Sequence, residues 1–388
     1  MGVTHFASAL LATSSLLGVT SAAVVDMPII VEDSYSMVQV GVGKPTQKFN
    51  LLFDTGSASA WMIDTHCAKE CPSIRKNRTG YNITASSTAK KTGEAAQITY
   101  LGGVVAGPTV QDRMSADGLT WTSKFIAANE SNWSSLAANG FMGLAFGSIT
   151  DGGATPVFES LMAQKLMDKP RFGLYYSRKD SQGTKGKPGK GLLTLGGSKE
   201  KKYTKGKLET VQLTTGSNGD YDVWRSVLHS SIGTQKGKKN SAPKKNTVDF
   251  SGASIVFDTG ASGISVAPSK VEALYESIGM NWTAILKGKH VPLCSEFTKD
   301  WSVSFEVGFF GNTKFINVTG DQLALPGFAN RDDACWPPFD DQGSDGFALF
   351  GSRFLKNFYT IWDYGSFPDK NGPALSPTLS FGYLKDGY

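Results

Sequence analysis

An internal repeat constrains the fold of this chain of 388 residues more than any other feature. Apolar residues alternate from Phe49 to Phe53, which predicts a strand with one buried face, and this strand ends at Asp54-Thr55-Gly56. About half a chain later, Ile255-Val256-Phe257 leads in the same way into Asp258-Thr259-Gly260. A repeat with this period predicts two similar lobes that meet at a cleft, each presenting one aspartate at the end of a strand.

The composition indicates that both lobes are built mainly from β-strands. The chain has 44 glycines and 23 phenylalanines but only 19% charged residues, which favours turns and packed sheets over long surface helices. Alternating valines predict another strand at 38–42, and one helix is expected over Pro268 to Ile278, covering a sheet. We therefore expect an all-β fold with an N-terminal lobe at 34–176 and a C-terminal lobe at 177–386.

The first 23 residues are typical of a secretory signal peptide. They are apolar or small and lack charged side chains, and the apolar core is too short for a membrane anchor. Cleavage is expected near Ala23, although a buried first strand or helix is the alternative. No later apolar run reaches the length of a membrane-spanning helix, and residues 380–388 are too polar for a lipid-anchor signal.

Glycosylation sequons also favour secretion. Six Asn-x-Ser/Thr motifs occur, none with proline at the middle position. They begin at Asn77, Asn82, Asn129, Asn132, Asn281 and Asn317. We therefore expect a soluble extracellular glycoprotein.

The four cysteines are Cys67, Cys71, Cys294 and Cys335. In an oxidising compartment an even number suggests two disulfides, and three pairings are possible. A zinc site made from Cys67, Cys71 and His66 is the competing interpretation, but no fourth ligand lies nearby in the sequence. We expect no bound metal.

The net charge of +5 comes from two segments. Lysine and arginine are concentrated at 178–207 and 236–245, and acidic residues outnumber basic ones in the rest of the chain. Both segments are rich in glycine and lysine, which predicts solvated loops. Contact with an anionic surface such as a cell-wall polyanion is the alternative, and we expect no nucleic-acid partner.

Two aspartates brought together from two lobes favour a particular chemistry. Like charges a few ångströms apart raise one pKa strongly, so the pair shares one proton over a useful pH range. The ionised carboxylate can then take a proton from water while the protonated carboxyl donates to a carbonyl oxygen. This is general acid–base hydrolysis without a covalent intermediate.

Further motifs occur in a fixed order around the repeat. They are Trp61, Ile98-Thr99-Tyr100, Phe141-Met142-Gly143-Leu144-Ala145, Ala154-Thr155-Pro156-Val157-Phe158, Leu195-Gly196-Gly197 and Leu349-Phe350-Gly351-Ser352-Arg353-Phe354. With them, nearly all of the chain from Tyr35 to Gly382 resembles the pepsin-like aspartic proteases, and the secreted fungal members most closely.

The resemblance implies roles for individual residues. Asp54 and Asp258 would be catalytic, and the residues implied to support them are Thr55, Gly56, Ser57, Thr259, Gly260 and Ser262. Tyr100, Leu101 and Gly102 would belong to the flap, a hairpin that closes over substrate, and Trp61 would hydrogen-bond to Tyr100. The family pattern implies Cys67–Cys71 and Cys294–Cys335 disulfides, no cofactor, a protein or peptide substrate, and a monomer.

Three departures from the family pattern lead to further expectations. Leu101 replaces the usual flap glycine, which implies a stiffer flap or a narrower pocket. Ala261 replaces a common threonine or serine, and losing that hydroxyl should raise the pKa of the dyad, giving a less acidic activity optimum than that of pepsin. The short stretch between Ala23 and Asp54 leaves no room for the inhibitory prosegment of the family, so either the enzyme is secreted active or an exon is missing from the gene model.

The sequence therefore predicts an aspartic endopeptidase that prefers bulky hydrophobic residues around the scissile bond. A pepsin-fold binding or inhibitory module without catalysis is the alternative from another class, but such relatives usually lose a catalytic aspartate. A serine hydrolase is disfavoured because no G-x-S-x-G motif occurs, and a nucleotide-binding protein because 183–191 has no Walker A spacing.

Overall fold

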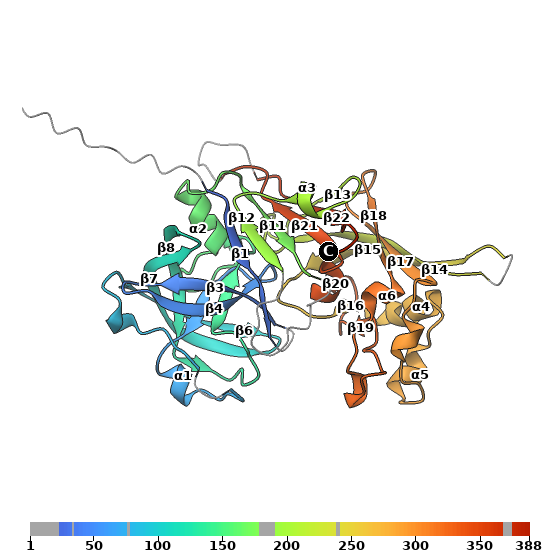
Figure 1. The fold of residues 1–388 in the computed structure, drawn as a ribbon, viewed down its shortest axis with the longest axis horizontal. Coiled ribbons are helices and arrows are strands. Elements are labelled where there is room, and N and C mark those ends of the chain that lie inside the picture. Colours follow the sequence, from blue (N-terminus) through green and yellow to red (C-terminus); the bar gives the residue numbers. More distant parts are fainter. Residues whose placement is uncertain (1–22, 33–34, 76–77, 178–190, 238–240, 368–374) are drawn as a thin grey trace, which may run out of the picture.

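The structure is a computed structural model that describes residues 23–32, 35–75, 78–177, 191–237, 241–367 and 375–388. Three β-sheets make up the framework of the described chain, and short helices and loops connect their strands (Figure 1). The predicted all-β, two-lobed fold class is confirmed. The predicted signal peptide lies outside the described residues except for Ala23.

A nine-stranded sheet forms the N-terminal lobe, with the order β2-β3-β4-β10-β5-β8-β7-β6 and with β9 paired to β7. The strands are β2 (Ile30–Glu32), β3 (Tyr35–Val42), β4 (Gln47–Asp54), β5 (Trp61–Ile63), β6 (Lys90–Tyr100), β7 (Gly103–Ala116), β8 (Leu119–Ala128), β9 (Glu130–Ser131) and β10 (Gly140–Gly143). Short helices join them: α1 (Cys67–Glu70), η1 (Ile83–Ala85), η2 (Gly147–Ile149) and α2 (Val157–Ala163). The strands predicted at 38–42 and 49–53 lie in β3 and β4.

A seven-stranded sheet forms the C-terminal lobe, in the order β18-β17-β14-β15-β20-β16-β19. Its strands are β14 (Arg225–Gln235), β15 (Lys244–Phe257), β16 (Ile264–Val266), β17 (Trp301–Val307), β18 (Lys314–Thr319), β19 (Asp340–Asp341) and β20 (Phe347–Phe350). The helices of this lobe are α4 (Pro268–Ser277), α5 (Trp282–Leu286), η3 (Cys294–Glu296), α6 (Gly320–Leu323), η4 (Phe328–Asn330) and α7 (Ser352–Leu355).

The predicted helix is α4, which begins at Pro268 and ends at Ser277, one residue earlier than expected. Proline suits the first turn because its missing N–H would have no helical partner there. Val271, Leu274 and Tyr275 are buried on one side of the helix, which packs against β14 and β15. As the sequence predicts, α4 covers a sheet.

The third sheet takes strands from both halves of the chain and lies between the lobes, across the top of Figure 1. Its order is β1-β12-β11-β21-β22-β13, with β1 (Val25–Pro28), β11 (Arg171–Tyr175), β12 (Leu192–Leu195), β13 (Glu209–Gln212), β21 (Phe358–Asp363) and β22 (Thr378–Tyr383). Helix α3 (Glu200–Tyr203) follows β12. The boundary predicted between residues 176 and 177 falls within this sheet, between the paired strands β11 and β12.

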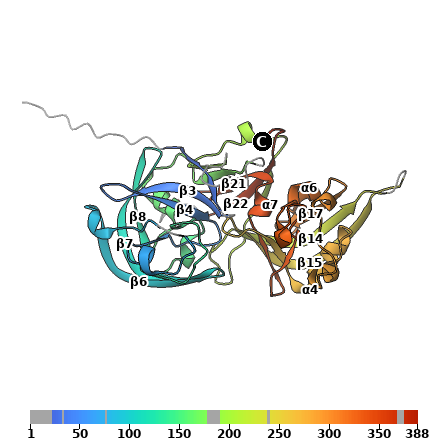
Figure 2. The ribbon, with the colours of Figure 1, turned by 60° about the horizontal axis from the view of Figure 1, so that its bottom comes forward.

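The two lobes repeat one local arrangement where the Asp-Thr-Gly motifs lie. In the N-terminal lobe β10 runs parallel to β4 and antiparallel to β5. In the C-terminal lobe β20 runs parallel to β15 and antiparallel to β16. Figure 2 shows the lobes side by side, with β4 in one and β15 in the other. Each strand that leads to an aspartate therefore lies beside a strand of the apolar-apolar-glycine motif.

Both disulfides expected from the resemblance, Cys67–Cys71 and Cys294–Cys335, form in the structure. The first uses both thiols that the alternative zinc site would need, while His66 is exposed. In the described part of the chain, no three or more His, Cys, Asp or Glu side chains are grouped so that they could hold a metal ion. No helix within the described ranges has the length and apolar character needed to span a membrane.

The lysine-rich segments are described only in part, because 178–190 and 238–240 lie outside the described residues. Lys201 and Lys202 are exposed in α3, and Lys244 and Lys245 are exposed at the start of β15. The second segment is thus partly strand and not wholly loop. Lys244 and Lys245 pair with Gln235 and Thr234 in the β14–β15 hairpin, which extends to the right in Figure 1.

Candidate active site

The two Asp-Thr-Gly motifs meet across the lobes. A Cβ atom added to Gly56 would lie 2.5 Å from the carboxyl carbon of Asp258, and one added to Gly260 would lie 2.5 Å from Oδ1 of Asp54. Each glycine therefore lies against the aspartate of the other motif, and any side chain at its position would clash with that carboxyl group. The structure brings Asp54 and Asp258 together, and both are largely buried.

The two threonines fix this arrangement by exchanging hydrogen bonds. The Thr55 amide donates to Oγ1 of Thr259 over 3.0 Å, and the Thr259 amide donates to Oγ1 of Thr55 over 2.9 Å. Each hydroxyl also donates to a carbonyl of the other lobe, Thr55 to Phe257 and Thr259 to Phe53. All these groups are buried, so losing one partner would leave polar atoms unpaired.

The carboxylates receive different donors within their own motifs. Asp54 accepts from the Gly56 amide over 2.9 Å and from the hydroxyl of Ser57. Asp258 accepts from two amides of its motif, those of Gly260 over 2.7 Å and of Ala261 over 3.2 Å. Ala261 is the positional counterpart of Ser57, three residues after its aspartate, so the Asp258 side lacks the hydroxyl donor.

The environment raises the pKa of the Asp258 carboxyl well above its usual range. Burial is the largest cause, followed by the negative charge of Asp54 and a hydrogen bond with the Asp54 carboxyl. The Gly260 and Ala261 amides oppose this shift but do not overcome it. The Asp258 carboxyl therefore keeps its proton to a higher pH than an isolated aspartate does.

Ser262, which the resemblance implied as a dyad-supporting residue, makes no side-chain hydrogen bond to either carboxylate among the described residues, and its supporting role remains a prediction. Its side chain is exposed and makes no hydrogen bond to Asp258 in the described structure. The reason is its position, one residue beyond the counterpart of Ser57. Its carbonyl instead accepts the amide of Arg353 over 3.0 Å.

Strands β6 and β7 form the hairpin that carries Tyr100. The Trp61 indole N–H donates to the Tyr100 hydroxyl over 3.0 Å, as the resemblance implies. Burial and the negative charge of Asp54 raise the pKa of Tyr100, and a hydrogen bond with Ser57 partly offsets that shift. The tyrosine therefore lies within electrostatic reach of Asp54 and remains a neutral hydroxyl.

Leu101 and Gly102 form the turn of this hairpin. The Leu101 side chain is 95% exposed, and its backbone has no positive φ angle, so glycine is not required there. Gly102 is different, because an added Cβ would lie 2.2 Å from a ring atom of Trp133. Gly102 therefore places a steric constraint on the turn. The stiffness expected from Leu101 remains a prediction.

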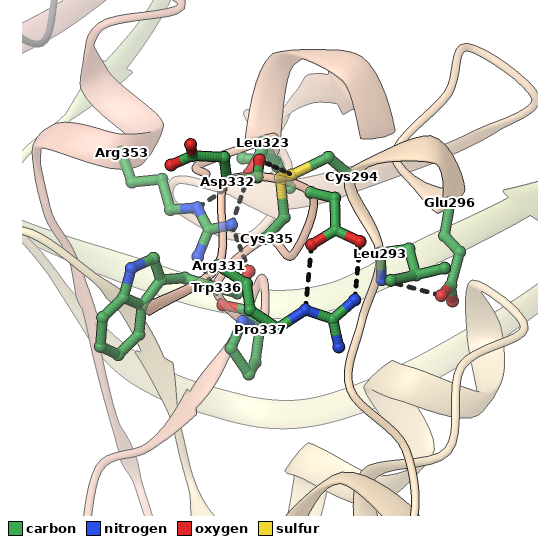
Figure 3. Close-up of a disulfide and its surroundings, with 11 residues drawn as sticks. Leu293, Cys294, Glu296, Leu323, Arg331, Asp332, Cys335, Trp336, Pro337 and Arg353 are labelled. Carbon is green, nitrogen blue, oxygen red and sulfur yellow. Dashed lines mark hydrogen bonds and ion pairs between the residues drawn. A yellow bond between two sulfur atoms is a disulfide. The ribbon is translucent and has the colours of Figure 1, made fainter. Parts of the chain in front are cut away.

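Arg353 is a further residue near the site, one to which the sequence analysis assigned no role. It is 4% exposed, and its guanidinium donates to the carbonyls of Leu323, Trp336 and Pro337 (Figure 3). Burial lowers its pKa to about 10, so it stays charged at neutral and acid pH. A single charged residue within an otherwise uncharged segment, Phe350 to Leu355, is the signal that could have identified it.

Five of the six predicted glycosylation asparagines are in the described structure, and Asn77 is outside it. Asn132 and Asn281 are exposed, whereas Asn82, Asn129 and Asn317 are half-buried. The side-chain oxygens of Asn82 and Asn281 cap η1 and α5, respectively. Asn132 lies beside the flap, which the sequence analysis did not foresee.

Comparisons with known proteins agree with this geometry. The family model for eukaryotic aspartyl protease matches residues 34–367. Cathepsin E of Rattus norvegicus is 28% identical over 350 residues, which cover 88% of this chain and 79% of the relative. Cathepsin D of Clupea harengus and pepsin A of Sus scrofa are each 27% identical, and each match covers 84% of this chain and 77% of the relative. The chain therefore belongs to the eukaryotic aspartyl protease family, whose members are aspartic-type endopeptidases.

Proposed function

We propose that the chain is a secreted aspartic endopeptidase in which Asp54 and Asp258 activate water to hydrolyse peptide bonds. The observation that carries this proposal is the reciprocal contact of each motif glycine with the opposite aspartate. Together with the exchanged threonine hydrogen bonds, it holds two carboxyl groups close enough to share one proton.

The donors support separate starting roles for the two carboxyls. Asp54 accepts hydrogen bonds from an amide and a hydroxyl, and we assign it as the base that takes a proton from water. Asp258 holds the shared proton and donates it to the carbonyl oxygen as the water oxygen bonds to the carbonyl carbon. Asp54 then returns its proton to the leaving nitrogen as the C–N bond breaks, and Asp258 recovers a proton from the diol.

Aromatic residues around the flap support a preference for bulky hydrophobic side chains. The Tyr100 ring lies 5.0 Å from that of Phe141 and 5.7 Å from that of Trp133, and Trp61 stacks on Phe141 at 5.0 Å. Apolar walls beside a catalytic carboxylate favour apolar substrate groups, because their contact removes apolar surface from water. An extended peptide would bind by backbone hydrogen bonds to such a hairpin.

The proposal of secretion depends on the apolar first 23 residues and the sequons, and the assignment to the fungal type depends on the ordered motifs. An oxidising compartment also fits the two disulfides. We further propose that the enzyme is a monomer. The exposed lysines of α3 and β15 are candidates for contact with an anionic surface.

Incubation of the purified protein with an unfolded protein substrate from acid to neutral pH tests this function. We expect cleavage next to bulky hydrophobic residues, identified by mass spectrometry of the products, and its loss on adding pepstatin, an inhibitor of aspartic proteases. A folded, disulfide-bonded sample that binds peptides but cleaves none at any pH would instead support the binding-module alternative.

A further inference from the structure

The outer edge of the flap is covered by the segment that follows β8. Strand β9 pairs with β7 just beyond the flap turn, with Val105 opposite Ser131 and Ala106 opposite Glu130. The amide of Asn129 also donates to the carbonyl of Ala106 over 3.0 Å. The flap strand β7 is therefore paired on both sides up to Val105, with β6 on its other side.

Asn132 extends this pairing by one residue toward the tip of the flap. Its amide donates to the carbonyl of Val104 over 3.1 Å, and its side-chain Oδ1 accepts the Val104 amide over 2.7 Å. The side chain thus takes the place of a backbone carbonyl in the ladder. Val104 lies two residues after Gly102, so this hydrogen bond is close to the turn itself.

Trp133 contacts the flap from inside at the same point. It is only 8% exposed, and its ring lies 5.7 Å from the Tyr100 ring and 5.4 Å from the Phe141 ring. Its ring also fills the space in which a Cβ at Gly102 would lie. Two consecutive residues therefore contact the flap. Asn132 hydrogen-bonds to Val104 at the edge of β7, and the Trp133 ring packs against Gly102 in the turn.

We propose that Asn132 and Trp133 are positioning residues that hold Tyr100 and the flap turn in the arrangement seen here, Asn132 through Oδ1. We call this arrangement, in which Trp61 donates to Tyr100, the closed flap. This inference rests on the proposed endopeptidase function. A flap that spends less time closed binds substrate and inhibitor more weakly, in proportion to the closed fraction that is lost. Once substrate is bound and the flap is closed, the two carboxyls are unchanged, so the KM should respond more than the kcat.

The sequon allows the hydrogen bond to be separated from any sugar. A glycan on Asn132 would be attached to Nδ2, which makes no hydrogen bond to another residue within the described ranges, and would leave Oδ1 available. Asn132→Ala removes both the acceptor and the sequon, whereas Asn132→Asp removes the sequon but keeps an acceptor. Ser134→Ala removes only the sequon, because the Ser134 contacts are made by its backbone.

The test compares these three variants, made in a glycosylating host, by peptide kinetics, pepstatin binding and amide exchange at Val104. For Asn132→Ala we expect the KM, the pepstatin Kd and the exchange rate at Val104 each to rise about three- to tenfold, the range of one lost hydrogen bond. The kcat should change less than twofold. Asn132→Asp and Ser134→Ala should match the wild type, and Trp133→Phe should change the same quantities in the same direction as Asn132→Ala.

Two results would overturn the inference. If Ser134→Ala reproduced the Asn132→Ala changes, the sugar and not the hydrogen bond would position the flap. If Asn132→Ala left the Val104 exchange rate and the KM at wild-type values, Asn132 would not position the flap. A wild-type protein without peptidase activity would contradict the proposed function. Amide exchange needs no catalysis, so the exchange rates would still test whether Asn132 positions the flap.

Discussion

At the scale of single residues, Asp54 and Asp258 occupy equivalent positions but differ in one donor. Ser57 supplies a hydroxyl to Asp54, whereas Ala261 supplies only its amide to Asp258. The sequence identified this substitution, and the pKa of Asp258 is indeed raised, although burial and the charge of Asp54 are its main causes. The missing hydroxyl leaves these two effects without an opposing side-chain donor.

Restoring that donor should shift activity toward acid pH. In the proposed mechanism the high-pH limb of the activity profile reports ionisation of the protonated carboxyl, assigned to Asp258. A hydroxyl at position 261 favours the ionised form and lowers the pKa of Asp258. We expect Ala261→Thr to move that limb down by up to about one pH unit. Ala261→Val has the same shape without the hydroxyl and should leave the limb in place, and equal shifts in both variants would exclude the hydrogen-bond explanation.

At the scale of structural elements, the sequence predicted the repeated strands and helix α4. It did not predict the third sheet or the role of Arg353. The strands ending at Asp54 and Asp258 have clear apolar patterns, and α4 has helical spacing. The third sheet has no such signal, because β11 and β12 are short, almost fully buried runs without a period, and β1 has only four residues. Arg353 was also missed, since its partners Leu323, Trp336 and Pro337 are carbonyl groups far away in the sequence.

Arg353 joins α7 to α6 and to the segment after Cys335 (Figure 3), so its loss should destabilise the C-terminal lobe. Arg353→Met has a similar length but leaves three carbonyls without their donor. We expect the free energy of unfolding to fall by roughly 3 kcal/mol, seen as a lower melting temperature. Arg353→Lys keeps the charge but has fewer donors, so its stability should lie between those of the wild type and Arg353→Met. An Arg353→Met variant as stable as the wild type would contradict this role.

At the scale of the whole molecule, association of the lobes buries an acid that prefers to be protonated. The usual pKa of Asp258 is 3.8, and its value in the folded protein is higher. Between these two values the folded state binds more protons than the unfolded state, so stability falls as pH rises through this window. The penalty is absent below the ordinary pKa and complete above the raised one.

This linkage predicts the effect of removing the charge. Asp258→Asn cannot ionise, so the variant should melt at a higher temperature than the wild type near neutral pH and at a similar temperature near pH 3. Melting temperatures measured across this range provide the test. If the difference in melting temperature between the variant and the wild type stayed constant from acid to neutral pH, the pKa of Asp258 would not be raised by folding.

The motifs predicted the family and the fold of the molecule better than the contacts between its parts. Paired Asp-Thr-Gly motifs indicate shared-proton chemistry because few other sequences place two carboxyls at matching strand ends. By contrast, Asn132 was recognised only as a sequon, since its contact with Val104 depends on how β9 folds back on the flap. Contacts of this kind arise from tertiary packing, which one sequence does not encode in any local pattern.

The most direct test of the account is the pH dependence of kcat/KM for peptide cleavage, measured for the wild type and for Asp54→Asn and Asp258→Asn. We predict a bell-shaped wild-type profile that reports two apparent pKa values of the pair, and loss of activity in both folded variants. Ser262→Ala, which alters an exposed residue without a described side-chain hydrogen bond to either carboxyl, serves as the control and should keep the wild-type profile. Cleavage that persists with either aspartate replaced would contradict the shared-proton dyad.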